Sequence, residues 1–252
     1  NQLPNHSFID FLGMEADDWK FIKKDAPKGA NISDDELLFL VEKELKAGHQ
    51  KLFIVLHAYG SHFNYKERYP EEFARFQPAN ATEVEYKNKD QLINAYDNSI
   101  LYTDYFLHSL IGILKNSGAD ATMIYSPDHG EDLLDDNRKR FLHASPIPTY
   151  YQIHIPFLMW FSDNYIKARP EKFEVARYNS NAPISSNASI FHTLLEMAEI
   201  NTPYFDASYS LVVRRPRMYL GDHDQPVNYY EVGLKKEDKE MILKRGMDHS
   251  IQ

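Results

Sequence analysis

An aspartate and a histidine stand side by side in the stretch YSPDHGEDL, residues 125–133, directly after the apolar run ATMIYS. The apolar run is typical of a buried strand, and PDHG is typical of a turn at the carboxyl end of that strand. Asp128 and His129 offer an oxygen and a nitrogen ligand to a metal ion from adjacent backbone positions. The structural alternative is a polar turn that only ends the strand.

Further histidines lie close to two other apolar runs. His57 and His62 come at the end of KLFIVLHAYGSH, and His143 precedes IPFLMWFS. If the three runs form neighbouring parallel strands, their carboxyl ends meet at one edge of a sheet, where these side chains can converge with Asp128 and His129. Imidazoles and a carboxylate without sulfur favour a catalytic zinc or manganese site over a structural one.

The composition limits the classes of function. The 252 residues carry a net charge of −9 and contain no cysteine. The acidic balance argues against nonspecific nucleic-acid binding and against a polybasic membrane anchor. The lack of cysteine excludes disulfides, thiolate metal ligands and cysteine nucleophiles within these residues. The chain begins at Asn1 without a signal-peptide pattern, so we expect a processed or excised piece of a longer protein.

Amphipathic segments alternate with the apolar runs. Residues 33–50 have apolar side chains at helical spacing behind a capping Ser33, and a long helix is predicted from about Asp90 to Lys115. This alternation predicts an α/β fold, namely a three-layer α/β/α sandwich with a mostly parallel central sheet. Its central strands are expected in residues 51–57, 121–126 and 155–162, in a single domain that spans residues 1–252.

Four ordered motifs resemble a known family. HAYGSH, SPDHGE, LHASP and QIHIPFLMWFS are similar to the catalytic domain of the phosphoethanolamine transferases that modify lipid A, which belong to the alkaline phosphatase/sulfatase superfamily. The resemblance covers roughly residues 50–200. It implies that Asp128 and His129 bind the catalytic zinc, and that His62 and His143 bind substrate phosphate or a second zinc. His57 matches the first histidine of its motif and is a third candidate catalytic residue.

The resemblance also implies an activity. Such enzymes transfer phosphoethanolamine from phosphatidylethanolamine to lipid A, or to a related cell-envelope glycan, through a threonine nucleophile. The implied cofactor is one or two zinc ions, in preference to manganese or calcium. The implied location is the inner membrane, with this domain in the periplasm and without a nucleic-acid partner.

The chain departs from the family pattern in several places. Pro127 stands where the family has serine, and Phe63 and Asn64 follow His62 where the family has Gly-Pro. Nothing in residues 1–50 resembles the nucleophilic threonine or the metal-binding glutamate of the family. We therefore expect a catalytic domain that is truncated on its amino-terminal side, with both residues upstream, and no activity from residues 1–252 alone.

Alternatives remain for the function and for individual residues. A sulfatase or phosphodiesterase of the same superfamily is the nearest alternative function, and a non-catalytic module that binds a metal or an anion is the second. Glu131 can accept a hydrogen bond from a metal-binding imidazole and so orient its ring, or it can cap the segment that follows it. His154 is either such a supporting group or a structural residue, and His57 can simply bond a backbone carbonyl.

Overall fold

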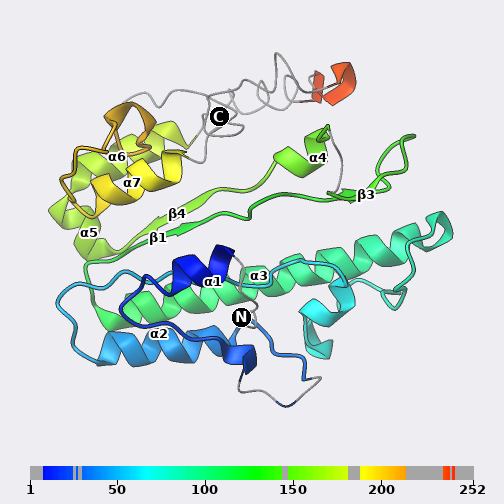
Figure 1. Cartoon of the computed structure of the whole chain (residues 1–252), viewed down its shortest axis with the longest axis horizontal. Helices are drawn as coiled ribbons and strands as arrows, with labels where there is room; N and C mark the ends of the chain where they lie inside the picture. The colour runs from blue at the N-terminus through cyan, green and yellow to red at the C-terminus, as the bar shows by residue number, and fades with distance from the viewer. Residues whose placement is uncertain are drawn as a thin grey trace. The chain divides into compact units, whose positions relative to one another are not determined.

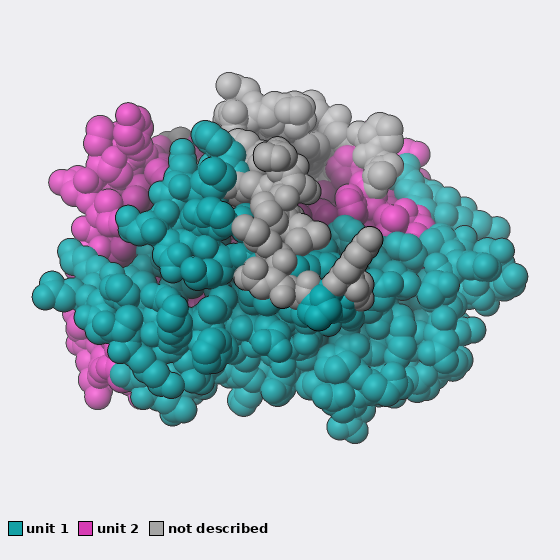
Figure 2. All heavy atoms as spheres, turned by 60° about the horizontal axis from the view of Figure 1, so that its bottom comes forward, with its two compact units in different colours: residues 1–117, 133–140 teal, residues 118–132, 141–252 magenta. Residues whose placement is uncertain are grey.

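The structure is a computed structural model that describes residues 8–24, 27, 30–143, 147–180, 188–213, 235–238 and 240–241. Two compact units divide the chain. Unit 1 contains residues 1–117 and 133–140, and unit 2 contains residues 118–132 and 141–252; Figure 2 colours them separately. The prediction of a single domain over residues 1–252 stays a prediction.

Unit 1 is built around one long helix. It contains α1 (Phe8–Gly13), η1 (Ile22–Lys24), α2 (Glu36–Lys46), η2 (Tyr65–Arg68), η3 (Glu71–Phe73), η4 (Tyr86–Asn88) and α3 (Lys89–Ser117). The face of α3 that includes Leu92, Tyr102 and Phe106 is buried, and α2 packs against α3 with Leu37 and Val41 in the core (Figure 1). Both helices were predicted from their apolar spacing, and both predictions are confirmed.

A buried asparagine ties the polar excursion of residues 60–88 to α3. Asn98 is completely buried. Its Oδ1 accepts a hydrogen bond from the backbone N–H of Phe76 at 2.9 Å, and its Nδ2 donates to the carbonyl of Phe76 at 2.9 Å and to the Tyr69 hydroxyl at 3.3 Å. Because a buried amide is costly when its hydrogen bonds are unmade, this side chain fixes the path of the excursion.

The predicted strand at residues 51–57 is wrong in the structure. Among the described residues no strand pairs with this segment, which runs in irregular backbone from Lys51 to His57. Phe53 and Val55 are 72% and 74% exposed, whereas Ile54 and Leu56 are half-buried. The apolar run predicted burial, but a strand also requires a neighbour that bonds its N–H and C=O groups.

Unit 2 contains an antiparallel ladder with helices at both ends. Its elements are β1 (Thr122–Tyr125), β3 (Phe141–Leu142), α4 (Tyr150–Ile153), β4 (Leu158–Phe161), α5 (Asp163–Ala168), α6 (Pro170–Asn179), α7 (Ala188–Met197) and η5 (Ala207–Tyr209). The ladder consists of β1 and β4, with α5, α6 and α7 at one end and α4 at the other (Figure 1). A further short strand, β2 (Asp132–Leu133), falls at the boundary of the units and pairs with β3. The core lies where β4 meets α5 and α7 and contains Phe161, Tyr165, Met197 and Val212.

The two longer strands pair in the direction opposite to the one predicted. β1 and β4 are neighbours, as expected, but they are antiparallel, with Thr122 opposite Phe161 and Tyr125 opposite Leu158. The mostly parallel sheet is therefore not found among the described strands. The reason is the connection, because the chain leaves the ladder at Tyr125 and re-enters at Leu158, at the same end. A parallel pair would require a crossover to the other end.

The antiparallel ladder still gathers the segment that carries the candidate site. Residues 126–157 leave from and return to one end of the ladder, so the PDHGED turn and α4 both extend from that end (Figure 1). The chain combines helices with a small sheet and has the predicted α/β class. None of the described helices combines the length and the apolar character that a bilayer crossing requires.

An ion-pair network lies at the end of the ladder opposite the PDHGED turn. Arg169, at the junction of α5 and α6, donates to Asp120 at 2.8 Å and to Glu199 at 3.0 Å. The hydrogen bond from the guanidinium lowers the pKa of the Glu199 carboxyl to about 2. These pairs link the start of β1 to the segments that flank the core.

Candidate metal centre

Asp128 and His129 lie in the turn that follows β1. The backbone N–H of His129 donates to Asp128 Oδ1 at 3.1 Å, and this oxygen lies 3.8 Å from His129 Nε2. The Asp128 side chain is 90% exposed and that of His129 is 30% exposed. One carboxylate oxygen and one imidazole nitrogen therefore lie near each other at the surface of unit 2, as two ligands of one ion would.

The ring of His129 is held in a defined orientation. Its Nδ1 lies 2.9 Å from the carbonyl oxygen of Gly130. Because a carbonyl can only accept, Nδ1 carries the proton and Nε2 keeps its lone pair. Metal-binding histidines characteristically donate their second ring nitrogen to a carbonyl or a carboxylate in this way.

Glu131 connects His129 with His143. Its side chain is 5% exposed, and its Oε1 lies 3.1 Å from His143 Nδ1 and 4.0 Å from His129 Nδ1. The two imidazole rings are tilted by 33° with centroids 3.7 Å apart. In the part of the chain that the structure describes, His129, Glu131 and His143 are the one group of at least three such side chains with ligand atoms all within 4.8 Å of one another.

His143 is oriented by the same carboxylate. The bond to Glu131 Oε1 requires a proton on Nδ1, so the Nε2 atom of His143 is left to accept a hydrogen bond or to bind a cation. The structure thus brings together Asp128, His129 and His143, all predicted site residues of unit 2. Glu131 contacts His143, while its supporting role and the identity of the metal ligands stay predictions.

The turn is packed directly against α4. The Gly130 N–H donates to the carbonyl of Gln152 at 2.8 Å. A Cβ at Gly130 would lie 2.2 Å from the carbonyl oxygen of Tyr151, so only glycine fits this contact. The ring of His154, at the end of α4, stacks on Tyr150 with centroids 4.8 Å apart. The supporting role predicted for His154 stays a prediction.

His57 and His62 belong to the other unit. Both side chains are exposed, and His62 Nδ1 donates to the carbonyl of Phe63, which leaves its Nε2 atom available. The Arg68 Nε donates to the His62 carbonyl at 2.9 Å. The convergence of these two histidines with the unit 2 residues stays a prediction.

A buried aspartate that the sequence analysis missed holds the loop of His57 and His62. Asp34, 7% exposed at the start of α2, accepts from the N–H groups of Tyr59 and Gly60 at 2.9 and 2.8 Å. Gly60 has a positive φ of 55°, which suits a tight turn. The acidic run SDDE reads locally as a helix start, so no signal in it indicates a partner 25 residues away.

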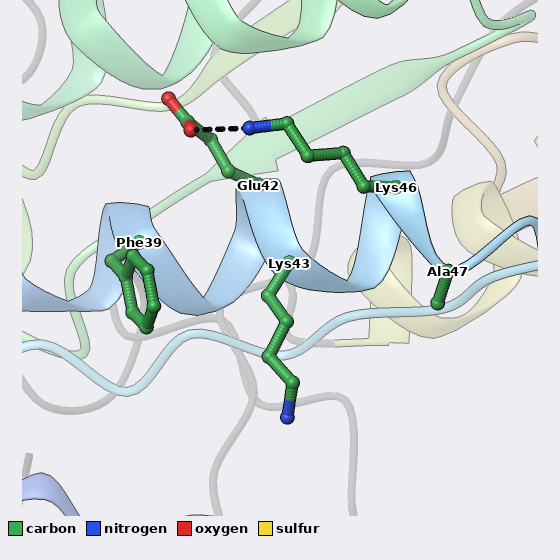
Figure 3. Close-up of a pocket in the computed structure, with 5 residues that line it drawn as sticks. All are labelled: Phe39, Glu42, Lys43, Lys46 and Ala47. Atoms are coloured by element: carbon green, nitrogen blue, oxygen red, sulfur yellow. Dashed lines mark hydrogen bonds and ion pairs between the residues drawn. The ribbon is translucent and has the colours of Figure 1, made fainter.

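The surface of α2 carries a shallow hollow formed by residues other than these histidines. Phe39, Glu42, Lys43, Lys46 and Ala47 line it. Figure 3 shows Phe39 and Lys43 extending to one side of the helix, while Glu42 and Lys46 form an ion pair at 3.1 Å on the other. It holds none of the predicted site residues.

Comparisons with known proteins agree with the geometry. A family model described as Sulfatase matches residues 2–200. The phosphoethanolamine transferase EptA of Helicobacter pylori is 33% identical over 195 residues, which are 75% of this chain and 34% of that protein. The Kdo(2)-lipid A phosphoethanolamine 7''-transferase of Escherichia coli K12 is 34% identical over 146 residues, which are 56% of this chain and 25% of that protein.

A solved structure also matches in fold. The C-terminal periplasmic domain of EptC from Escherichia coli, in complex with zinc, aligns with a TM-score of 0.79 and 23% identity over 95% of this chain and 68% of that chain. The likeness supports a sulfatase-like, alkaline phosphatase-type fold. The chain spans a quarter to about a third of the curated relatives named above, namely 25% and 34% of their length.

Proposed function

The chain belongs to the sulfatase family, and from that premise we propose that it forms part of a zinc-dependent phosphoethanolamine transferase that acts on lipid A or a related cell-envelope glycan. The observation that carries the proposal is a hydrogen-bonding pattern that three imidazoles share. His62, His129 and His143 each donate from Nδ1 to a carbonyl or a carboxylate, so each Nε2 can bind a metal or, once protonated, donate to a phosphate oxygen.

The donor atoms of unit 2 fit zinc. Zinc accepts imidazole nitrogen and carboxylate oxygen, and Asp128 and His129 place one of each 3.8 Å apart. When bound there, zinc supplies a Lewis acid that activates an oxygen nucleophile and stabilises charge on a phosphoryl group. In the proposal Asp128 and His129 are its ligands, and His62 and His143 bind the substrate phosphate or a second ion. Glu131 and His154 support the imidazoles.

The residues of this chain then act on the phosphoryl group. In the first half-reaction a threonine oxygen forms a bond to phosphorus, and the bond from phosphorus to the glycerol oxygen of phosphatidylethanolamine breaks. The Nε2 lone pair of His143 or of His62 takes up the proton that the threonine hydroxyl loses and gives it to the departing diacylglycerol oxygen, while Glu131 holds the His143 ring. An acceptor hydroxyl or phosphate oxygen reverses these steps and takes the phosphoethanolamine.

The nucleophile and one metal ligand are proposed to come from outside residues 1–252. The curated relatives named above are three to four times as long as the stretch that matches this chain, which leaves room for both groups in a longer protein. We further propose that the domain works in the periplasm beside the inner membrane, and the likeness to the periplasmic domain of Escherichia coli EptC supports this location. Residues 1–252 alone are then inactive.

The test compares two site variants with a matched surface variant. Asp128→Asn and His129→Ala, made in the whole protein that carries these residues, are expected to lose zinc and to stop transferring label from a fluorescent phosphatidylethanolamine to lipid A. His49→Ala removes an imidazole that pairs with Glu44 at the surface and should change neither property. Elemental analysis measures the zinc, and thin-layer chromatography separates the labelled lipids.

The outcomes separate the proposal from its alternatives. Unchanged zinc content in both site variants would overturn the assignment of the metal ligands. Release of the headgroup to water, without transfer to lipid A, would identify a hydrolase of the same superfamily instead. Zinc binding without any headgroup cleavage by the whole protein would leave the non-catalytic module.

A further inference from the structure

A second carboxylate lies directly behind the candidate metal centre. Asp132 follows Glu131 in the chain and is 3% exposed. Its Oδ1 accepts a hydrogen bond from the Thr149 hydroxyl at 2.6 Å, and its Oδ2 accepts from Gln152 Nε2 at 2.5 Å. Thr149 is completely buried and Gln152 is 6% exposed, so the three side chains form a polar cluster in the interior of unit 2.

The Gln152 amide contacts the segment on each side of the Glu131–His143 pair. Besides Asp132, its Nε2 lies 3.5 Å from the carbonyl oxygen of Leu142, which is a long hydrogen bond. Asp132 adjoins Glu131, and Leu142 adjoins His143. The Gln152 amide therefore bridges the segment that contains Glu131 and the segment that contains His143. These two residues are themselves in contact at 3.1 Å.

The main chain of α4 supports this bridge. The Gln152 carbonyl accepts from the Gly130 N–H at 2.8 Å, so Gln152 bonds the turn through its backbone as well as through its side chain. The first N–H of α4, that of Tyr150, donates to Asp238 Oδ1 at 2.8 Å, and Asp238 is completely buried. Helix α4 is thus fixed at its start and presents Gln152 to both segments.

We propose that Asp132 and Gln152 are positioning residues that set the separation of Glu131 from His143 and, by holding Gln152 where its carbonyl binds the Gly130 N–H, the place of the turn that carries His129. The proposal rests on the proposed zinc-dependent function and concerns residues that touch neither the metal nor the substrate. The reason is geometric, because metal ligands are useful only within a few tenths of an ångström of their ideal positions. Loss of the groups that orient such ligands typically weakens metal binding about 10- to 100-fold.

The chemistry of the cluster predicts which substitutions are tolerated. Asp132→Asn keeps one oxygen for Gln152 Nε2, and its new amide can donate to Thr149, since a hydroxyl accepts as well as donates. Asp132→Leu and Gln152→Leu keep most of the side-chain volume but remove the bridge. We expect the two leucine variants to bind zinc about 10- to 100-fold more weakly and Asp132→Asn to retain most of the affinity.

The experiment measures zinc affinity and stability separately. The variants are made in the whole protein, zinc dissociation constants are obtained by competition with a chromophoric chelator, and thermal unfolding is followed without metal. Asn179→Leu is the matched control. Its buried amide donates to the carbonyl of Leu211 at 2.8 Å in the same unit, so its loss should lower stability and leave the zinc constant unchanged.

Each result supports or overturns the proposal. Weaker zinc binding in both leucine variants, with recovery in Asp132→Asn and no change in Asn179→Leu, supports it. Wild-type zinc constants in the leucine variants overturn it and leave a structural role. If the leucine variants fail to fold, Thr149→Val removes a single hydroxyl of the same cluster, and its zinc constant decides. Absence of zinc binding in the wild-type protein would instead overturn the proposed function.

Discussion

Replacing Gly130 by alanine should disable the candidate centre although it adds only one methyl group. The added Cβ would lie 2.2 Å from the carbonyl oxygen of Tyr151 and 3.3 Å from its carbonyl carbon. Ordinary contact begins at about 3.4 Å, so the turn or α4 must move by roughly 1 Å. Both atoms belong to the backbone, and no rotation of a side chain relieves the overlap.

The size of the effect follows from two terms. Overpacking a well-packed interior costs about 1–3 kcal/mol. The movement also breaks the 2.8 Å bond from the Gly130 N–H to Gln152, which contributes about 0.5–1.5 kcal/mol. The free energy of unfolding should therefore fall by about 1.5–4.5 kcal/mol. A displacement of about 1 Å at His129 and Glu131 should lower the transfer rate by about 100-fold.

The control is a glycine with free space around it. Gly112 lies in α3, and a Cβ there meets nothing within 4 Å. Because alanine favours helix by about 1 kcal/mol over glycine, Gly112→Ala should be neutral or stabilising. Urea titration gives the free energies of unfolding, and headgroup transfer gives the rates. A Gly130→Ala protein with wild-type stability and rate would refute the close packing of the turn on α4.

Three further changes have defined outcomes. Glu131→Gln should retain zinc within about 100-fold of the wild-type affinity, because an amide oxygen still orients the imidazole beside it; complete loss of zinc in equilibrium dialysis would make Glu131 a ligand itself. Asp34→Asn replaces an acceptor oxygen by an N–H donor opposite the Gly60 N–H, so the free energy of unfolding measured by urea titration should fall by about 1–3 kcal/mol. An unchanged value would contradict the anchoring by Asp34 of the loop that carries His57 and His62. The pKa of Glu199 falls from 4.5 to about 2 in the folded state because Arg169 donates to it. The contribution of Glu199 to stability is therefore present above about pH 4.5 and is lost as the pH falls toward 2. Arg169→Met should flatten this part of the curve of melting temperature against pH, and an unchanged curve would refute the pairing.

Local patterns in the sequence determined the helices and the candidate residues. The apolar spacing in α2 and α3 repeats within each helix, so a short window suffices to predict both. The same holds for β1 and β4, which are short apolar runs between turns. Asp128 and His129 were identifiable as candidates because two adjacent residues of metal-binding type at the end of an apolar run form a compact signal.

The direction of strand pairing was decided by the tertiary structure. An apolar run has the same composition in a parallel and in an antiparallel ladder, so residues 122–125 and 158–161 could predict neighbours but not their sense. The sense depends on where the connection returns, and residues 126–157 return to the end they left. Likewise, residues 51–57 have the composition of a strand and lack a described partner to pair with.

The residue types show which side chains could bind a metal, whereas the way these side chains are held depends on the fold. The Nδ1 bond of His143 sets which nitrogen its ring presents, and Glu131 makes this bond across 12 positions of sequence. Asp132 bonds Gln152 across 20 positions. No short window contains both members of such a pair. Glu131 and His143 flank the paired strands β2 and β3, and the folding of α4 onto the turn brings Gln152 to Asp132.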